Sequence, residues 1–150
     1  MTIDMKTGKH WLQDPQKAGV WQMADDPREF AQQAAALGLQ VHRIDIHGVH
    51  GKGDLLALLA RTLQFPPTFG GNWDALADCL KELSWAEAPG WVVILERAKH
   101  YCAGHREDFT EAMDVFAEAA EFWRGEGRPF WTFIAGPEGW ASGWSAVPAA

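Results

Sequence analysis

Apolar residues recur along this chain in two alternating patterns, and the alternation predicts an α/β fold. Short apolar runs of strand length occur at residues 19–23, 39–46, 91–95 and 130–134. Between these runs, apolar residues return every three or four positions, which is typical of helices with one buried face. Strands that alternate with helices indicate a parallel sheet joined by helical crossovers. The run at 91–95 is almost wholly apolar, as expected for a strand covered on both faces.

Helix boundary signals divide the chain into an arm, one domain and a tail. Asp26 and Pro27 predict a helix start, Asp54 is expected to cap a helix that runs to about residue 64, and Asp108 to Glu111 match a capping box. Residues 1–18 contain several lysines and Pro15, so a flexible N-terminal arm is expected there. Residues 19–135 form the predicted domain, and 136–150 a C-terminal tail from which Trp140 and Trp144 could fold back.

Charge and composition narrow the classes of partner. The 150 residues include 13 Lys and Arg against 20 Asp and Glu, so the net charge is −7. Binding to nucleic acid needs a basic face, so an acidic chain argues against nucleic acid as the direct ligand, whereas attraction to a basic protein fits. Two cysteines, no apolar leader and no membrane-length apolar run predict a cytoplasmic protein with reduced thiols. We expect a monomer when free, with no cofactor and no membrane contact.

One predicted helix, from Trp73 to about Leu83, separates acidic and apolar residues onto two faces. At about 100° per residue, Asp74, Asp78 and Glu82 are spaced i, i+4, i+8 and form one column. The opposite stripe is apolar and is expected to be buried; it comprises Trp73, Leu76, Ala77, Leu80 and Leu83. Like charges at i, i+4 repel by a few tenths of a kcal/mol per pair.

Two interpretations of this acidic column are open from spacing alone. A plain solvated face is the commoner one, since most charged faces are only surface. The other is a column of acceptors that awaits Arg, Lys and His side chains of a partner. The preceding loop contains prolines and an aromatic residue followed by Gly70 and Gly71, and Asn72 is placed to cap the helix. A phosphate cradle at this glycine pair is disfavoured, because Asp74 in the first turn would repel the phosphate.

The segment 65–78, Phe-Pro-Pro-Thr-Phe-Gly-Gly-Asn-Trp-Asp-Ala-Leu-Ala-Asp, resembles the barstar family of ribonuclease inhibitors. The resemblance continues through Val92–Glu96, Val115–Ala119 and the last predicted strand, so it covers roughly residues 40 to 135. It implies a two-layer α/β fold with a three-stranded parallel sheet, here extended by an extra N-terminal strand and helix. Family members block the active site of a basic, guanyl-type extracellular ribonuclease inside the producing cell.

The resemblance also implies a set of partner-binding residues. Asp78 would be the central mimic of an RNA phosphate, with Asp74 beside it and Glu118 of a later helix at the rim. Asn72 would be the cap that positions the inhibitory helix. The remaining expected contacts come from the loop and the helix itself, at Thr68, Phe69, Gly70, Gly71, Trp73 and Ala77. Thr68, Gly71 and Ala77 are departures from residues that family members carry at these positions.

Two other functions are compatible with parts of the sequence. An immunity or antitoxin-type protein that binds a different nuclease or toxin would use the same acidic helix. A small metal-dependent hydrolase would instead use Asp45, His47 and His50, which cluster where a strand meets a turn. Cys79 has acidic neighbours that would raise its pKa, so an inert thiol is expected. On balance the sequence predicts a binding protein and no enzyme.

Overall fold

Four parallel strands in one sheet form the centre of the molecule, which confirms the predicted α/β class. The structure is a computed structural model that describes residues 10–24, 26–66, 69–82 and 88–146. The strands are β1 (Val20–Ala24), β2 (Gln40–Asp45), β3 (Trp91–Glu96) and β4 (Phe130–Gly136). Their order across the sheet is β1-β4-β3-β2. The N-terminal strand thus adds a fourth member beside β4, as the predicted extension requires.

Burial follows the position of each strand in the sheet. The central strands β3 and β4 are buried along their whole length except for Glu96, whereas the edge strands β1 and β2 are mostly half-buried. The central pair is in register from Trp91 opposite Phe130 to Leu95 opposite Ile134. The apolar run at 91–95 is therefore covered on both faces, as its composition predicted.

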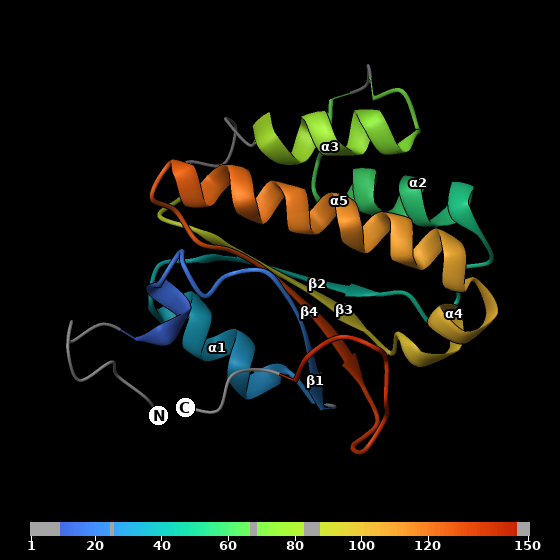
Figure 1. Cartoon of the computed structure of the whole chain (residues 1–150), viewed down its shortest axis with the longest axis horizontal. Coiled ribbons are helices and arrows are strands. Elements are labelled where there is room, and N and C mark those ends of the chain that lie inside the picture. Colours follow the sequence, from blue (N-terminus) through green and yellow to red (C-terminus); the bar gives the residue numbers. More distant parts are fainter. Residues whose placement is uncertain (1–9, 25, 67–68, 83–87, 147–150) are drawn as a thin grey trace.

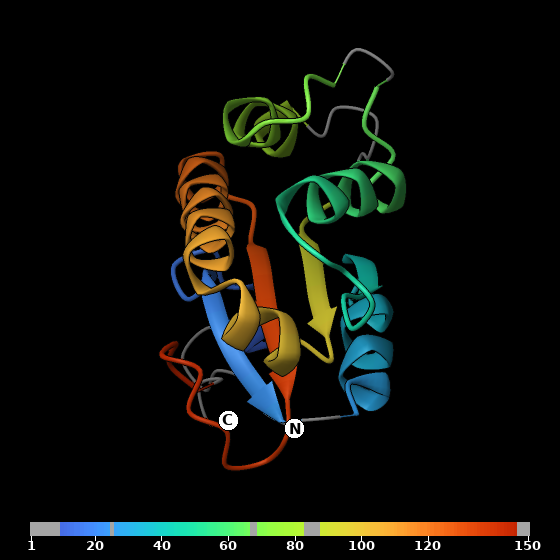
Figure 2. The ribbon, with the colours of Figure 1, turned by 90° about the vertical axis from the view of Figure 1, so that its right-hand side faces the viewer.

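Helices cover both faces of this sheet (Figures 1 and 2). On one side lie α2 (Lys52–Thr62), α4 (Lys99–Gly104) and α5 (Arg106–Gly125), and α3 (Trp73–Glu82) packs against α5 on the side away from the sheet (Figure 1). On the other side lie α1 (Arg28–Ala36) and a short 3₁₀ helix, Trp11–Gln13. The core is accordingly split in two by the sheet. In the described residues no helix is long and apolar enough to cross a membrane.

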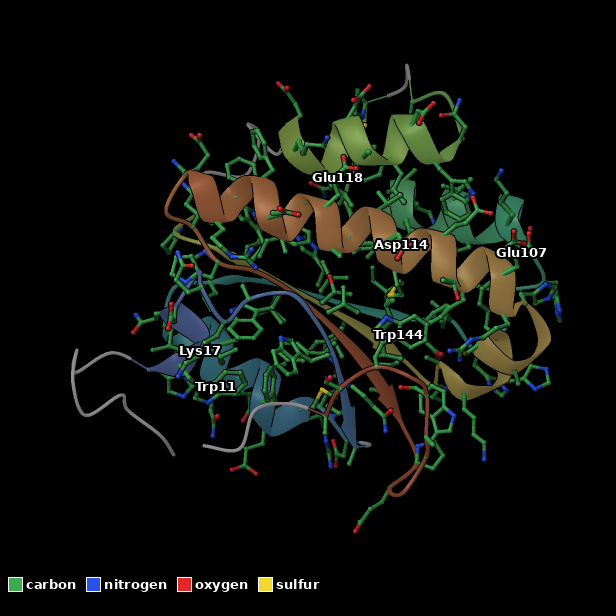
Figure 3. All side chains as sticks on the ribbon, in the orientation of Figure 1. Trp11, Lys17, Glu107, Asp114, Glu118 and Trp144 are labelled. Carbon is green, nitrogen blue, oxygen red and sulfur yellow. The ribbon has the colours of Figure 1, made fainter. Side chains whose placement is uncertain are left out.

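The predicted flexible arm is wrong for residues 10–18, which pack onto the second face of the sheet. Trp11 and Leu12 are buried, and Trp11 stands edge-on to Trp131 with ring centroids 5.1 Å apart (Figure 3). The indole N–H of Trp131 donates to the Leu12 carbonyl at 2.7 Å. Residues 1–9 of the predicted arm lie outside the described part. Apolar contact with the uncovered sheet face outweighs the polar composition that suggested a loose arm.

The tail folds back, as the two tryptophans suggested. The ring of Trp144 stands edge-on to Phe109 at 5.4 Å, and the guanidinium of Arg106 lies 4.7 Å from it (Figure 3). The backbone N–H of Gln22 in β1 donates to the Ser145 carbonyl at 2.7 Å. The tail therefore covers part of the outer edge of β1, which would otherwise present unpaired backbone groups.

Two predicted caps are wrong because the helices start earlier than the signals suggested. Helix α2 begins at Lys52, and Asp54 lies inside its first turn, where its carboxylate accepts the His50 backbone N–H at 3.3 Å. Helix α5 begins at Arg106, directly after α4, so the capping box expected at Asp108 is not at a helix start. In both cases the preceding turn winds into the helix without a side-chain cap.

Candidate functional site

Helix α3 is held on the body of the protein by its apolar face. Leu76 and Leu80 are fully buried against the core that α5 also covers. The buried indole of Trp123, on α5, donates to the Leu80 carbonyl at 2.9 Å. On the other side, the Lys52 ammonium of α2 lies 5.2 Å from the ring of half-buried Trp73. These contacts from two helices fix the direction in which the opposite face of α3 points.

The start of α3 is capped as predicted. The side-chain oxygen of Asn72 accepts the Ala75 backbone N–H at 2.7 Å, and its carbonyl accepts from Leu76 at 3.0 Å. Gly71, immediately before, has a φ of +69°, a conformation that glycine adopts without steric penalty. The exposed glycine pair therefore turns the chain sharply into a helix whose first turn has a side-chain acceptor at Asn72.

The acidic column lies on the solvent side of α3. Asp74, Asp78 and Glu82 are all exposed. In the described part of the chain, neither Asp74 nor Asp78 is in an ion pair. Burial raises the pKa of the Cys79 thiol, and the charges of Asp78 and Glu82 raise it further. The expected inert thiol is thus supported, and Asp74 and Asp78 present negative charge that no cation in the described part of the chain neutralises through an ion pair.

Glu118 lies beside the acidic helix, but it has a partner there. Its carboxylate forms an ion pair with the Lys81 ammonium of α3, and both groups keep substantial exposure, 56% for Glu118 and 31% for Lys81. Figure 3 shows Glu118 on the side of α5 that faces α3. The sequence placed Glu118 near the rim of the site but did not reveal Lys81 as its partner. At this exposure the pair contributes little to stability and can rearrange when a partner approaches.

The loop before α3 is partly anchored in the core. The rings of Phe65 and Phe69 lie 5.2 Å apart and pack against the buried cluster. The Phe69 N–H donates to the Pro66 carbonyl at 2.9 Å. Gly70 next to it is exposed, while Ala77 on the helix is half-buried and brings no charge. The predicted contact at Thr68 falls outside the described residues.

The alternative metal site is contradicted by the contacts of its three residues. The Asp45 carboxylate accepts hydrogen bonds from Nε of Arg97 at 3.1 Å and from Nη2 of the same side chain. It also accepts one from the His47 backbone N–H at 3.0 Å. The hydrogen bond from Arg97 lowers the pKa of Asp45. Across the residues that the structure describes, no three His, Cys, Asp or Glu side chains are grouped so as to hold a metal ion. Asp45, His47 and His50 therefore offer no shared ligand geometry.

Trp123 is the anchoring residue that sequence reasoning missed. It lies on the buried face of α5 together with Phe109 and Phe116. A buried tryptophan normally needs an acceptor for its indole N–H, and that requirement was the available signal. The sequence could not show that the acceptor is a carbonyl of α3.

Comparisons with known proteins agree with this architecture. A family model described as Barstar (barnase inhibitor) matches residues 39–135, which is more than half of the chain. Among proteins with curated descriptions, none matches the sequence. One similar solved structure is that of the Aeropyrum pernix ORC2 protein in ADPNP–ADP complexes, with 17% identity and a TM-score of 0.54. The similarity covers 80% of this chain but only 35% of that one, and at this identity it shows the fold alone.

Proposed function

The chain belongs to the barstar family, and from that premise we propose that it inhibits a basic, barnase-type ribonuclease by inserting helix α3 into the active site. One observation carries the proposal. Asp74 and Asp78 are exposed on a helix fixed from two sides, with no ion-pair partner in the described residues. Carboxylates held in this way lose little conformational freedom on binding, so more of their electrostatic attraction remains as affinity.

Charge complementarity supports a cationic active site as the target. A ribonuclease holds an RNA phosphate with cationic side chains, and a carboxylate can take the place of that phosphate. Opposite unit charges about 4 Å apart attract by about 4 kcal/mol at an effective dielectric of about 20. The net charge of −7 would also speed the encounter with a basic partner.

The residues around the column would have different roles in such a complex. Asp78, in the middle of α3, would meet the cations that bind the RNA phosphate, and Asp74 would lie beside it. Glu118 would join at the rim, where its pairing with Lys81 can be exchanged for a cation of the nuclease. Gly70 and Gly71 would bring backbone groups close to the partner.

Inhibition of RNA cleavage tests the proposal. The purified chain is titrated into a guanyl-specific bacterial ribonuclease of the barnase type, and cleavage of RNA is followed. We expect saturable one-to-one inhibition that weakens between about 0.05 and about 0.5 M NaCl, because salt screens the charges in the encounter. If several such ribonucleases retain full activity at a large excess of the chain, the proposal is wrong.

A second candidate, an immunity-type protein for another nuclease or toxin, is favoured by one feature of the loop. Gly71 carries no side chain and has a positive φ, so the loop offers only backbone at a position where this sequence departs from other family members. Basic nucleases of other classes, included in the same titration, separate the two candidates. Inhibition confined to such a nuclease would favour the second.

A further inference from the structure

The two edges of the sheet are protected in different ways. At one edge, β2 carries exposed Arg43 and Asp45, and charged side chains of this kind discourage pairing with another strand. At the other edge, β1 has the sequence Val-Trp-Gln-Met-Ala, which contains no charge and includes residues that favour strands. An uncharged edge strand is a template for pairing with another chain unless something covers it.

The tail segment, residues 140–146, takes the place of a fifth strand at the centre of the β1 edge. The backbone N–H of Gln22 points away from β4 and donates to the Ser145 carbonyl at 2.7 Å, and Gln22 and Ala146 form a parallel bridge. Alternate residues of a parallel strand direct their backbone groups to opposite sides, so Val20 and Ala24 also face outward. These are the groups that a strand of another chain would need.

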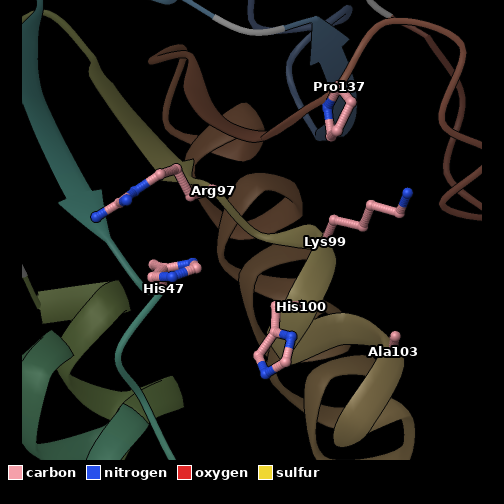
Figure 4. Close-up of a pocket in the computed structure, with 6 residues that line it drawn as sticks. All are labelled: His47, Arg97, Lys99, His100, Ala103 and Pro137. Carbon is pink, nitrogen blue, oxygen red and sulfur yellow. The ribbon is translucent and has the colours of Figure 1, made fainter.

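A turn after β4 brings the tail segment back to β1. Pro137 follows β4 at the edge of a pocket near the carboxyl ends of the strands (Figure 4), and its carbonyl accepts the Trp140 N–H at 3.1 Å. The ring of Trp140 then packs against the core cluster that α5 covers. The tail segment therefore reaches β1 from the same side of the sheet as α5.

The side chain of Gln22 also holds the tail segment. Its amide nitrogen donates to the Trp140 carbonyl, and its amide oxygen accepts from the Ser142 backbone N–H at 3.0 Å and from the Ser142 hydroxyl. Ser142 is only 1% exposed, so these hydrogen bonds are shielded from water. One residue of β1 thus binds the tail segment through both its backbone and its side chain.

The start of α5 provides the second half of the docking site. The Arg106 guanidinium donates to the Ser142 carbonyl at 2.6 Å and lies 4.7 Å from the ring of Trp144, which stands edge-on to buried Phe109. Gly143, between these two tail residues, has a φ of +100°, and a β carbon there would lie 2.5 Å from Nη2 of Arg106. The tail segment is therefore matched to this position by shape as well as by hydrogen bonds.

We propose that the tail segment guards β1 against self-association, and that its release lets β1 pair edge to edge with β1 of a second copy of this chain. Antiparallel pairing centred on Gln22 places the two Gln22 residues opposite each other across a twofold axis. Val20 of each copy then lies opposite Ala24 of the other, and no like charges meet. The pairing does not involve α3, so it is separate from the proposed ribonuclease inhibition.

Hydrogen exchange and sedimentation equilibrium of the full chain test the proposal together. In the double variant Arg106→Gln/Trp144→Ala, β1 keeps its sequence, but the tail segment loses its hydrogen bond from Arg106 and its ring contact with Phe109. At low protein concentration the Gln22 amide should exchange at least about tenfold faster than in the wild type, because the tail segment opens more often. At high concentration the double variant should dimerise at least about tenfold more tightly than the wild type, and protection of the Gln22 amide should return.

Two further variants show whether any dimer forms through β1. Arg61→Gln is the matched control, because it removes an equal charge from an exposed site on α2 and should leave both measurements unchanged. Addition of Gln22→Lys to the double variant places like charges opposite each other at the centre of the free edge, so that chain should stay a monomer.

The outcomes that would overturn the proposal are distinct. It is wrong if the Gln22 amide of the double variant exchanges no faster than in the wild type, or exchanges faster while the chain stays monomeric at every concentration. It is also wrong if the chain with Gln22→Lys dimerises as strongly as the double variant. If the double variant does not fold, Gly143→Val, which displaces the tail segment by collision with Arg106, decides in the same way.

Discussion

Replacement of Asp78 by alanine should abolish most inhibition while leaving the fold intact. Asp78 is exposed on α3, makes no ion pair in the described residues, and lies on the face opposite buried Leu76 and Leu80. Exposed substitutions of this kind change stability by no more than about 0.5 kcal/mol. Removal of the like charge at i, i+4 from Asp74 should even stabilise the helix by a few tenths of a kcal/mol.

The loss in affinity should be far larger than the change in stability. In the proposed complex Asp78 is enclosed among cations that lack another counter-charge. Removing one member of an enclosed ion pair costs about 3 to 5 kcal/mol, because the remaining charge stays desolvated. At about 1.4 kcal/mol per factor of ten, Kd should rise by about 10² to about 4 × 10³-fold. Asp78→Asn should lose nearly as much, since the amide keeps the shape of the side chain but not its charge.

Inhibition constants and unfolding curves for the same samples separate binding from folding. Glu29→Ala is the matched control, because Glu29 is an exposed carboxylate of α1 on the opposite side of the sheet (Figure 1). It should reduce inhibition only through net charge, by a few-fold at low salt. If Asp78→Ala inhibits as well as Glu29→Ala, the helix face is misassigned. If Asp78→Ala loses inhibition together with its unfolding transition, the loss reports instability instead.

Two further predictions concern the supports of α3, and a third concerns the ion pair between Asp45 and Arg97. Asn72→Ala should lower the free energy of unfolding by about 1 kcal/mol in urea through loss of the helix cap, whereas Asn72→Ser should retain most of it. Trp123→Phe should cost about 1 kcal/mol or more by removing the hydrogen bond to Leu80, and an unchanged urea midpoint would contradict that role. Because Arg97 lowers the pKa of Asp45, the stability from this pair is present above the unfolded carboxyl pKa of about 4 and is lost as pH falls through the lower folded value. In Asp45→Asn the free energy of unfolding should therefore fall less steeply as pH is lowered. The same steepness as in the wild type would contradict the pairing.

The order of helices and strands was predictable because apolar residues recur along the chain at clear helical or strand spacings. All four strands and the helix from Trp73 to Glu82 lie within a few residues of their predicted places. The Asn72 cap was also predictable, because an Asn directly before an amphipathic stretch can accept a hydrogen bond from a backbone N–H of the first helical turn. The capping box at Asp108 was a wrong prediction because two helices follow one another there without a side-chain cap. Local signals cannot report such a junction.

Contacts between distant segments were beyond sequence reasoning. The packing of Trp11 and Leu12 on the sheet depends on a face that is uncovered only after the strands assemble. The ion pair between Lys81 and Glu118 likewise depends on how α3 crosses α5. The acidic column was visible as spacing, but the structure was needed to see that Asp74 and Asp78 form no ion pair with any residue it describes. The assignment of these residues to a partner surface stays a prediction.

Competition for the nuclease active site tests the central claim most directly. The affinity of the chain for a catalytically inactive barnase-type ribonuclease is measured by calorimetry with and without a saturating mononucleotide that occupies the phosphate site. If α3 takes the place of the RNA phosphate, the apparent Kd should rise in proportion to nucleotide concentration, and Asp78→Ala should lose both the affinity and this dependence. An affinity that nucleotide leaves unchanged would place the chain elsewhere on the nuclease and contradict the account.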